Sequence, residues 1–389
     1  MSWSGSSYVK PRAQGATGAL AALGAAACGA LLSVVLLLQG PGVPASFQAA
    51  PPEAAGELQP GFLSGDFSTD ARGAANYSIP LQVPPGTAEL QPDISLLYNS
   101  HAQDGALGMG WNLFGVSSIE RCQPPTLQEG RVGGVRYDAS DSFCLDGVLL
   151  VKTGTSPEGD VYRTEKEGWT RVVARGRAGS GPASFLARSK EGISLEFGGT
   201  PDSRILAVGR SDVRVWAVDR ITDRNGNSIE LGFLNNPEGS GAFYPSEIRY
   251  TSRASEAPLR KLELEYEARP DRAPRYFAGS PLFQNRRLRA VRTLVAVDGA
   301  MQTVRRYELQ YGQGQATGRS RLARVTELDA AGNHHPPTVF GWQEGAVALD
   351  APKALTQFGG EDYTCVWADL DGNGRDDLLC DQKTAPWSH

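Results

Sequence analysis

Short runs in which apolar and polar residues alternate recur along most of the chain, and turn-forming residues separate them. Four pairs of such runs follow one another in the middle of the sequence: 213–220 with 228–234, 247–251 with 261–268, 288–297 with 302–311, and 321–328 with 338–342. Asp298-Gly299 is the strongest turn signal between them, because Asp-Gly fits a two-residue hairpin turn. The pattern predicts an all-β body of antiparallel strands, arranged as a β-sandwich or meander.

The N-terminal part of the chain has a different pattern. Residues 18–38 are continuously apolar or small, and Lys10 and Arg12 precede them. Such a run is long enough for a hydrophobic helix that spans a bilayer, with the basic residues on the cytoplasmic side. Small residues at 43–45 also form a candidate signal-peptidase site. We therefore predict that residues 1–45 are a signal peptide or a membrane anchor.

Both alternatives export the remainder of the chain. After cleavage the protein would be secreted or extracellular; without cleavage it would stay in the periplasm or at the cell surface, touching the membrane only through its N-terminal segment. Residues 46–60 are rich in Ala, Pro, Glu and Gln, which is typical of a linker.

The formal net charge is −5, and the Lys and Arg residues form no long block. A nucleic-acid-binding protein needs a concentrated patch of positive charge, so we exclude nucleic acid as a partner. Four His residues, two of them adjacent, are too few for a His-rich metal centre. Gly and Pro, at 46 and 25 residues, are spread along the chain and suit short strands joined by turns.

An alternating acidic loop lies near the C-terminus, between two strand-like segments. Ca²⁺ prefers six to eight oxygen ligands at about 2.3–2.6 Å, and such a loop supplies several from one segment. The predicted ligands are the side chains of Asp369, Asp371, Asn373 and Asp377 and the backbone carbonyl of Arg375. We predict one Ca²⁺ site; the alternative is an acidic hairpin tip without an ion.

Five cysteines occur, and none is part of a Cys-x-x-Cys motif. Cys28 lies in the apolar run, which leaves Cys122, Cys144, Cys365 and Cys380. An even number of cysteines in an exported chain favours two disulfides, and four buried reduced thiols are the alternative. If the acidic loop is a hairpin tip, Cys365 and Cys380 lie opposite each other at a separation that a disulfide can span. We therefore predict a Cys365–Cys380 bridge.

Candidate catalytic residues are few. Glu263, Glu265 and Glu267 contain the Glu-x-Glu pair of ADP-ribosyltransferases, but they alternate with apolar residues, as on the solvated face of a strand. His334 and His335 precede two prolines, and we interpret them as an exposed loop pair. The sequence contains no nucleophile-elbow, phosphate-loop or His-Glu-x-x-His motif. We therefore predict that the chain is not an enzyme.

Several segments together are more specific than composition can explain. They are residues 73–87, 90–100, 107–111 and 117–122, followed by 141–147, 162–164, 223–227 and 266–271. This pattern resembles the SpvB/TcaC N-terminal domain family, which is found at the start of toxin-complex B subunits and of related large secreted toxins with Rhs-type repeats. The resemblance covers residues 61–345 and implies one SpvB-like β domain there.

Residues 350–389 resemble one FG-GAP (VCBS-type) blade, whose Ca²⁺ loop is the acidic motif. The resemblance therefore implies a single, partial β-propeller-like blade, although propellers need about four to eight blades. The chain also lacks the Rhs shell and effector domain of the family, so the resemblance indicates a truncated member.

The resemblance implies an exported, non-enzymatic scaffold module of a toxin-complex or Rhs-type virulence protein. Its partner would be an Rhs-type shell, a toxin subunit or a host surface component. The alternative is a Ca²⁺-dependent cell-surface adhesion or ligand-binding protein. An ADP-ribosyltransferase is the third hypothesis; in some family members that activity belongs to a separate C-terminal domain.

The first segments of the resemblance also predict local structure. Pro80 and the Val-Pro-Pro-Gly run at 83–86 cannot sit in the middle of a strand ladder, because each Pro lacks an N–H donor. We expect them at an edge or a crossover. Gly108 and Gly110 predict a close approach of the backbone that seats Trp111.

Overall fold

The computed structural model describes residues 57–123, 134–166, 168–254, 256–272, 274–344, 363–368 and 377–382. The chain divides into two compact units, one through Trp342 and one from Gln343 onward. Across the described residues the regular structure is β-strand, apart from one 3₁₀ turn at Pro237–Gly239. The predicted all-β class is therefore confirmed.

The first part of the larger unit is a closed barrel. Its strands are β5 (Ser118–Cys122), β6 (Ser142–Leu145), β7 (Val148–Ser156), β8 (Gly159–Thr164), β9 (Arg171–Arg175), β10 (Ser184–Arg188), β11 (Ser194–Phe197) and β13 (Val213–Thr222). From β5 to β11 each strand pairs antiparallel with the next, and β13 then pairs with both β5 and β11. This second pairing of β13 closes the ring. The short strand β12 (Arg204–Leu206) adds to β13.

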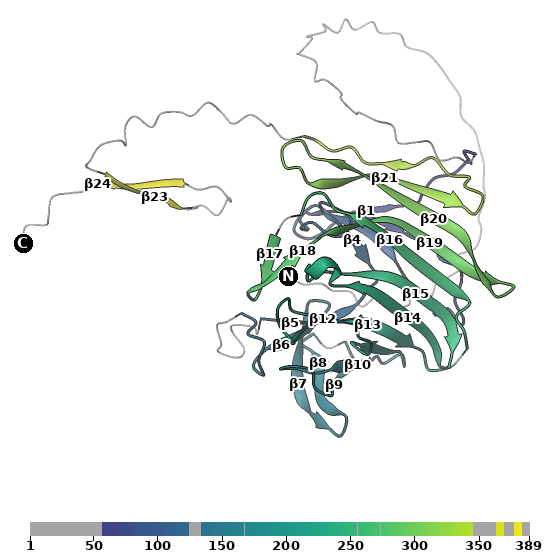
Figure 1. The fold of residues 1–389 in the computed structure, drawn as a ribbon, viewed down its shortest axis with the longest axis horizontal. Helices are drawn as coiled ribbons and strands as arrows, with labels where there is room; N and C mark the ends of the chain where they lie inside the picture. Colours follow the sequence, from purple (N-terminus) through teal and green to yellow (C-terminus); the bar gives the residue numbers. More distant parts are fainter. Residues whose placement is uncertain are drawn as a thin grey trace, which may run out of the picture. The chain divides into compact units, whose positions relative to one another are not determined.

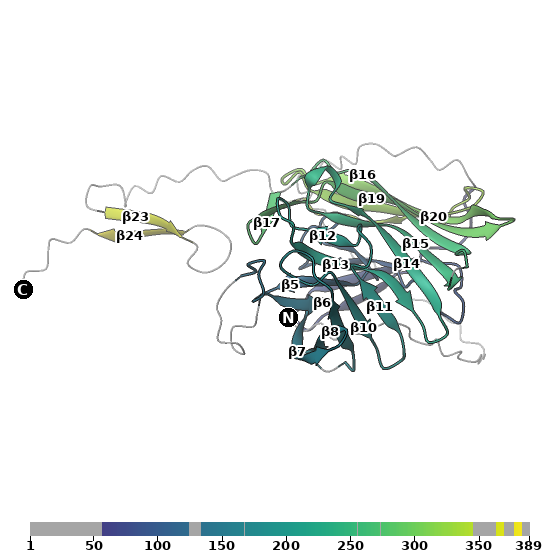
Figure 2. The ribbon, with the colours of Figure 1, turned by 60° about the horizontal axis from the view of Figure 1, so that its bottom comes forward.

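From β13 the same sheet continues as an open meander. It consists of β14 (Asn227–Asn235), β15 (Phe243–Arg253), β16 (Arg260–Ala268), β19 (Arg286–Val297), β20 (Ala300–Gln313), β21 (Ser320–Asp329) and β22 (Thr338–Val339). Figures 1 and 2 show these long strands beside the smaller barrel. All four predicted hairpins are present. The last strand is only two residues long, because Pro336 and Pro337 just before it have no N–H to donate.

Two further elements complete the larger unit. The hairpin β17 (Pro274–Phe277) and β18 (Ser280–Phe283) is inserted between β16 and β19. A separate four-stranded sheet contains β1 (Asp66–Thr69), β2 (Ala75–Pro80), β3 (Ser95–Asn99) and β4 (Trp111–Phe114). Ile79 and Leu96 face each other across β2 and β3, and both are fully buried. Residues 81–94 form the long loop between these two antiparallel strands, which we call the crossover loop. Pro84 and Pro85 lie outside the strand ladder, as predicted, whereas Pro80 is the last residue of β2 and pairs with Ser95.

The core runs through both parts of the larger unit. In the barrel, Phe143, Phe185 and Trp216 pack edge-to-face, with ring centroids 5.1–5.5 Å apart. This geometry suits the quadrupole of aromatic rings and fills the interior with side chains. Between the four-stranded sheet and the end of the unit, Trp111 packs on Phe340 with centroids 4.8 Å apart.

The predicted meander is confirmed, whereas closure into a barrel was not predicted. Closure depends on β11–β13 pairing, whose register shifts between Glu196 and Phe197. Such a bulge increases the local bend and twist of a strand. Within the described part of the chain, the four-stranded sheet contacts the open sheet in a sandwich-like arrangement. There the backbone N–H of Gln82, in the loop between β2 and β3, donates to the Tyr307 hydroxyl at 2.9 Å.

The smaller unit is described only as the hairpin β23 (Tyr363–Ala368) and β24 (Asp377–Gln382). Its register places Cys365 opposite Cys380. The remainder of the predicted propeller blade at 350–389 lies outside the described residues, and the blade stays a prediction. The predicted N-terminal helix at 1–45 also lies outside them, and within the described ranges no helix is long and apolar enough to cross a membrane.

Candidate functional site

A ladder of alternating charges crosses one face of the open sheet. It contains five basic and five acidic side chains, contributed by β13, β14, β15, β16, β19 and β20. In order they are Arg220, Glu230, Arg249, Glu247, Lys261, Glu263, Arg292, Glu265, Arg306 and Glu308. Each neighbouring pair is joined by an N–O contact of 2.6–3.6 Å. Cross-strand pairs of opposite charge stabilise a sheet, so we call this set the charge ladder.

The charge ladder contains the Glu-x-Glu pair. Glu263 contacts Lys261 and Arg292, and Glu265 contacts Arg292 and Arg306. On the opposite face of β16, Leu262 is fully buried. The prediction of a solvated strand face is therefore confirmed. Each carboxylate is held by two basic side chains on the sheet surface.

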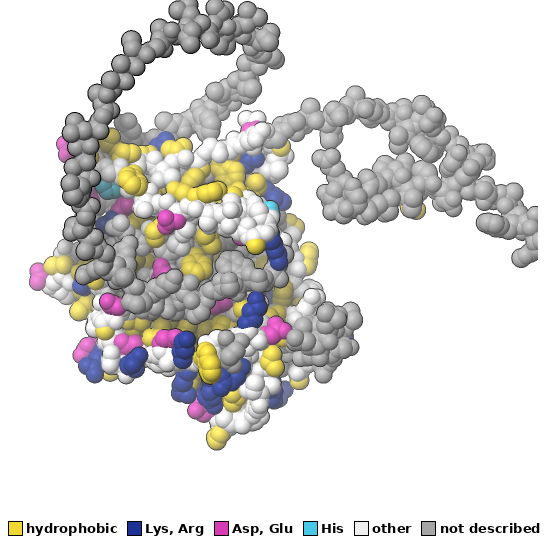
Figure 3. Space-filling model, turned by 180° about the vertical axis from the view of Figure 1, so that it is seen from behind, with side chains coloured by type: hydrophobic (Ala, Val, Ile, Leu, Met, Phe, Trp, Pro, Cys, Tyr) yellow, Lys and Arg dark blue, Asp and Glu magenta, His cyan; other side chains and the backbone are white. Residues whose placement is uncertain are grey.

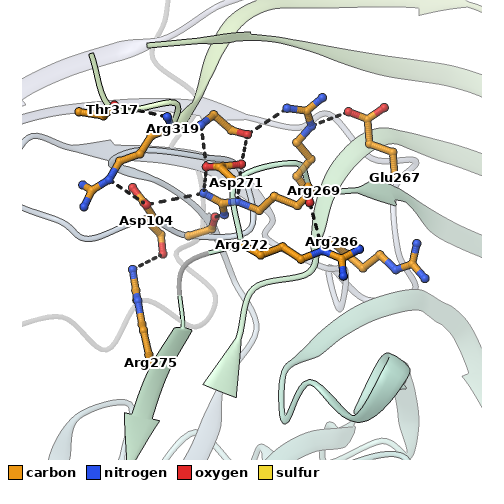
Figure 4. A network of polar contacts seen from close by, with 12 residues as sticks. Asp104, Glu267, Arg269, Asp271, Arg272, Arg275, Arg286, Thr317 and Arg319 are labelled. Carbon is orange, nitrogen blue, oxygen red and sulfur yellow. Dashed lines mark hydrogen bonds and ion pairs between the residues drawn. The ribbon is translucent and has the colours of Figure 1, made fainter. Parts of the chain in front are cut away.

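A second charged cluster is buried (Figure 4). The Arg269 side chain is 1% exposed and binds the Asp271 carboxylate through Nε at 3.0 Å and Nη2 at 2.9 Å. Asp271 also accepts hydrogen bonds from the backbone N–H and the hydroxyl of Ser320. Burial alone would raise the pKa of Asp271, but the bonds from Arg269 and Ser320 outweigh it and lower the pKa to about 2.

This cluster ties three loops together, and we call it the ionic knot. Arg269 follows β16, and its Nη1 donates to the Gly105 carbonyl at 2.7 Å on the β3–β4 loop. The Asp104 carboxylate, also on that loop, lies 3.7 Å from Arg269. Ser320 begins β21, and its carbonyl accepts the Met109 N–H at 2.9 Å. Arg269 and Asp271 therefore link the β3–β4 loop of the four-stranded sheet to the start of β21 in the open sheet.

The glycines before Trp111 have the predicted effect. Gly108 and Gly110 have φ of +90° and +74°, a region that favours glycine. A Cβ on Gly108 would lie 2.6 Å from the Ser320 carbonyl oxygen, and one on Gly110 would lie 2.6 Å from the Tyr98 ring. The backbone therefore approaches its neighbours closely here, and the indole of Trp111 is 2% exposed.

The barrel has a buried cation of its own. Arg121 has a fully buried side chain, which pairs with Asp141 at 2.6 Å. Its Nε donates to the Val213 carbonyl at 2.8 Å, and its Nη2 donates to the Ser180 hydroxyl at 3.0 Å. Sequence reasoning did not identify this residue. Arg121 could have been found from strand alternation, because it lies two residues after Ile119 and therefore on the same, buried face of β5.

One disulfide joins β5 to β6. It connects Cys122 with Cys144, whose Cα atoms are 5.9 Å apart. Cys365 and Cys380 are paired in the backbone register of β23 and β24, and their bridge stays a prediction.

The acidic loop from Asp369 to Arg375 lies outside the described residues, which include Asp377 only as the first residue of β24. Elsewhere, the described residues contain no group of three or more His, Cys, Asp or Glu arranged to hold a metal.

The His pair differs from its prediction. His334 and His335 are half-buried rather than exposed, because the chain before β1 covers them. The Gln59 N–H donates to the His334 carbonyl at 2.7 Å, and a Cβ on Gly61 would lie 2.7 Å from the His335 ring. The last residues of the predicted linker therefore lie against the β21–β22 loop.

The barrel exterior carries mixed charges. Figure 3 shows Lys and Arg side chains gathered over the barrel end of one face, with acidic side chains among them. Arg175 pairs with Glu158 at 2.5 Å, and Lys152 pairs with Asp160 at 2.6 Å. Such pairing reduces the positive electrostatic potential that would attract a polyanionic partner.

Comparisons with known proteins connect this geometry to a family. The family model described as SpvB, Salmonella virulence plasmid 65kDa B protein, matches residues 69–257. No curated protein sequence matches the chain. The match ends shortly after β15, so it includes the barrel and the first two strands added to it.

Solved structures share the fold over a longer stretch. A chain in the crystal structure of TcdB2-TccC3 is 18% identical to this chain, with a TM-score of 0.61. The match covers 85% of this chain and 19% of that chain. A chain in the structure of the Photorhabdus luminescens Tc holotoxin pore is 20% identical to this chain, with a TM-score of 0.63. The match covers 85% of this chain and 18% of that chain.

The N-terminal domain of the effector SpvB from Salmonella typhimurium strain LT2 has 20% identity and a TM-score of 0.53, with 64% of this chain and 98% of that one covered. The present chain thus spans about a fifth of the toxin-complex chains and nearly all of the SpvB domain. The chain is therefore similar to the SpvB family over residues 69–257, and its barrel and open sheet share the fold of toxin-complex subunits and of the SpvB N-terminal domain.

Proposed function

We propose that this chain is an exported, non-enzymatic scaffold module of a toxin complex. The observation that carries the proposal is the shared fold with toxin-complex subunits over 85% of the chain. Its own geometry agrees, because the Glu-x-Glu carboxylates are held in the charge ladder and Asp271 is held in the ionic knot. Buried and cross-linked polar groups of this kind stabilise a rigid body.

The partner we propose is an Rhs-type shell or toxin subunit. The support is that the fold neighbours are subunits solved together with TccC3 or within a holotoxin. The test is to mix the purified full chain with TccC3 and measure the molar mass by light scattering after size exclusion. A stable complex supports the proposal, and separate elution at micromolar concentrations contradicts it.

The non-enzymatic part has its own test. NAD⁺ consumption and transfer of labelled ADP-ribose to host extract should both stay at background. Glu265→Gln serves as the matched variant, because it removes one charge from the Glu-x-Glu pair on an exposed face. Activity in the wild type that this variant loses would contradict our interpretation of the ladder.

Export rests on residues 1–45. N-terminal sequencing of extracellular or periplasmic protein should begin near Ser46 if the segment is a signal peptide. A sequence that begins at Met1 in a membrane fraction would identify an anchor instead. Full-length protein in the soluble cytoplasm would contradict export altogether.

A second candidate function is Ca²⁺-dependent adhesion or ligand binding. The observation that favours it is the β23–β24 register, which pairs Ala368 with Asp377 and thereby joins the two ends of the acidic loop. Asp369, Asp371, Asn373, Asp377 and the Arg375 carbonyl form an oxygen donor set that suits Ca²⁺. We expect Ca²⁺ to raise the melting temperature of the hairpin unit, and Asp371→Ala to abolish that rise. An unchanged melt with Ca²⁺ or chelator would contradict the site.

The Cys365–Cys380 bridge belongs to the same proposal. Their opposed positions in the register support it, because a disulfide needs a short Cα separation. Peptide mapping of oxidised protein should recover the two cysteines in one cross-linked fragment. Free thiols at both positions would contradict the bridge.

A further inference from the structure

A cavity of about 340 Å³, open to solvent on one side, lies between the crossover loop of the four-stranded sheet and one end of the open sheet. The crossover supplies one wall, and β16, β19 and β20 supply the other. Its apolar lining consists of Val83, Pro84, Pro85, Val295 and Val304, and its basic lining includes Arg260. The wall from the crossover is the Val-Pro-Pro segment of the family pattern, to which the scaffold function assigns no role.

This wall is rigid before any ligand binds. The Tyr250 hydroxyl donates to the Pro84 carbonyl at 2.7 Å, and the Tyr307 hydroxyl accepts the Gln82 N–H at 2.9 Å. Burial raises the pKa of Tyr250, so its hydroxyl keeps the proton that it donates. Proline also fixes φ at two consecutive positions. A preformed pocket of this kind binds ligand without first ordering a loop.

The cavity carries an unbalanced positive charge. The side chain of Arg260 forms no ion pair among the described residues, and its Nη1 donates to the Leu259 carbonyl at 3.1 Å. Among the described residues, no acidic side chain lines this cavity. Arg305, at its edge, is paired with Glu327. Arg260 is therefore a cation without an acidic partner beside an apolar wall, which favours an anionic group next to its guanidinium.

We propose that this cavity binds a small organic carboxylate with an apolar body. The carboxylate contacts the Arg260 guanidinium, whose planar geometry suits it, and the apolar body packs on the Val83–Pro85 wall and on Val295. The volume lies at the low end of the range of about 300–1,000 Å³ that holds small ligands, which selects a compact molecule. This inference does not depend on the scaffold function.

The probe is 4-phenylbutyrate, added to the purified full chain and followed by saturation-transfer NMR and calorimetry. For a ligand of this size we expect a Kd on the order of 1 mM. Its uncharged amide should bind at least about tenfold more weakly, because it loses the charge-assisted bond to Arg260. Equal binding of acid and amide, or no binding of the acid, would overturn the proposal.

Two variants test the site from opposite walls. Arg260→Gln should weaken the acid at least about tenfold and leave the amide unchanged. Val304→Trp should abolish binding of both by filling the cavity; Val304 is 44% exposed, so the larger ring can be accommodated without unfolding. Arg289→Gln, at an exposed position on β19, is the matched control and should bind as the wild type does. If Arg260→Gln fails to fold, Val304→Trp alone decides, and unchanged binding in it would overturn the proposal.

Discussion

The barrel and the open sheet are built from one continuous meander, yet they protect their hydrogen-bonding edges and apolar faces differently. In the barrel, β13 pairs with both β5 and β11, so no edge remains and one face points inward onto the aromatic core. The open sheet keeps two faces and needs a cover for one of them. Closure leaves the barrel without unpaired strand edges. In the open sheet, the four-stranded sheet covers one face, and the ionic knot holds that cover in place.

Exposed and buried ion pairs in the open sheet contribute differently to its stability. The charge ladder lies on the solvent face of the open sheet, where exposed ion pairs contribute about 0–1 kcal/mol each. The ionic knot is buried, and removing one partner of a buried pair costs about 3–5 kcal/mol because the other charge stays without compensation. Each ion pair in the ladder therefore contributes less to the free energy of unfolding than the Arg269–Asp271 pair does.

The largest effect should come from breaking the ionic knot. Asp271→Ala leaves the Arg269 guanidinium buried without its carboxylate, and we expect a loss of about 3–5 kcal/mol in the free energy of unfolding. Urea denaturation followed by tryptophan fluorescence measures it. Asp66→Ala is the control, since Asp66 lies on the exposed strand β1. Equal destabilisation by both variants would contradict the special role of the knot.

Removing the barrel disulfide should have a slightly smaller effect. Cys122 and Cys144 are separated by 22 residues, and closing a loop of this length stabilises a protein by about 3 kcal/mol in the chain-entropy model. We expect the Cys122→Ser/Cys144→Ser double variant to lose that amount, with the loss of hydrogen-exchange protection concentrated in β5 and β6. A loss concentrated in β19–β21 would contradict the assignment of this bridge to the barrel.

Acid should weaken the ionic knot. The pKa of Asp271 is about 2 in the folded protein against an ordinary 3.8, so its stabilisation is present above pH 4 and disappears as the pH falls toward 2. The shift corresponds to about 2 kcal/mol. Unfolding free energies measured from pH 5 to pH 2 should therefore fall more steeply for the wild type than for Asp271→Asn. Parallel curves would rule out this linkage.

The smallest effect should come from the charge ladder. Glu265→Gln removes contacts to Arg292 and Arg306 on a half-exposed surface, and we expect a loss of less than about 1 kcal/mol. The loss should shrink further at about 1 M salt, where screening is strong. A loss as large as that of Asp271→Ala would mean that the ladder, and not the knot, holds the open sheet.

Local features of the fold could be predicted from the sequence, because alternation and turn residues act over short distances. Asp298-Gly299 correctly identified the β19–β20 hairpin. The same alternation identified the buried face of β16 and the solvated face with Glu263 and Glu265. The glycines at 108 and 110 correctly indicated a close approach around Trp111.

The non-local features could not be predicted in the same way. Arg121 meets Asp141, Ser180 and Val213, which three distant segments supply, and an arginine in an alternating run is normally solvated. The partner of Asp271 on β21 is equally remote in sequence. The cavity beside Arg260 likewise depends on the crossover loop reaching the far end of the open sheet. Such contacts follow from the closure of the fold and not from any local pattern.

Strand β13 pairs with four others, β5, β11, β12 and β14, and so belongs to both the barrel and the open sheet. During synthesis, β5 to β11 can pair one after another as they emerge, but the ring cannot close until β13 has left the ribosome. Pairing between strands so distant in sequence is slow, because the loop between them must lose its freedom first. Until that moment β5 and β11 are unprotected edges, so the interval before β13 arrives is when the nascent chain is most exposed to aggregation.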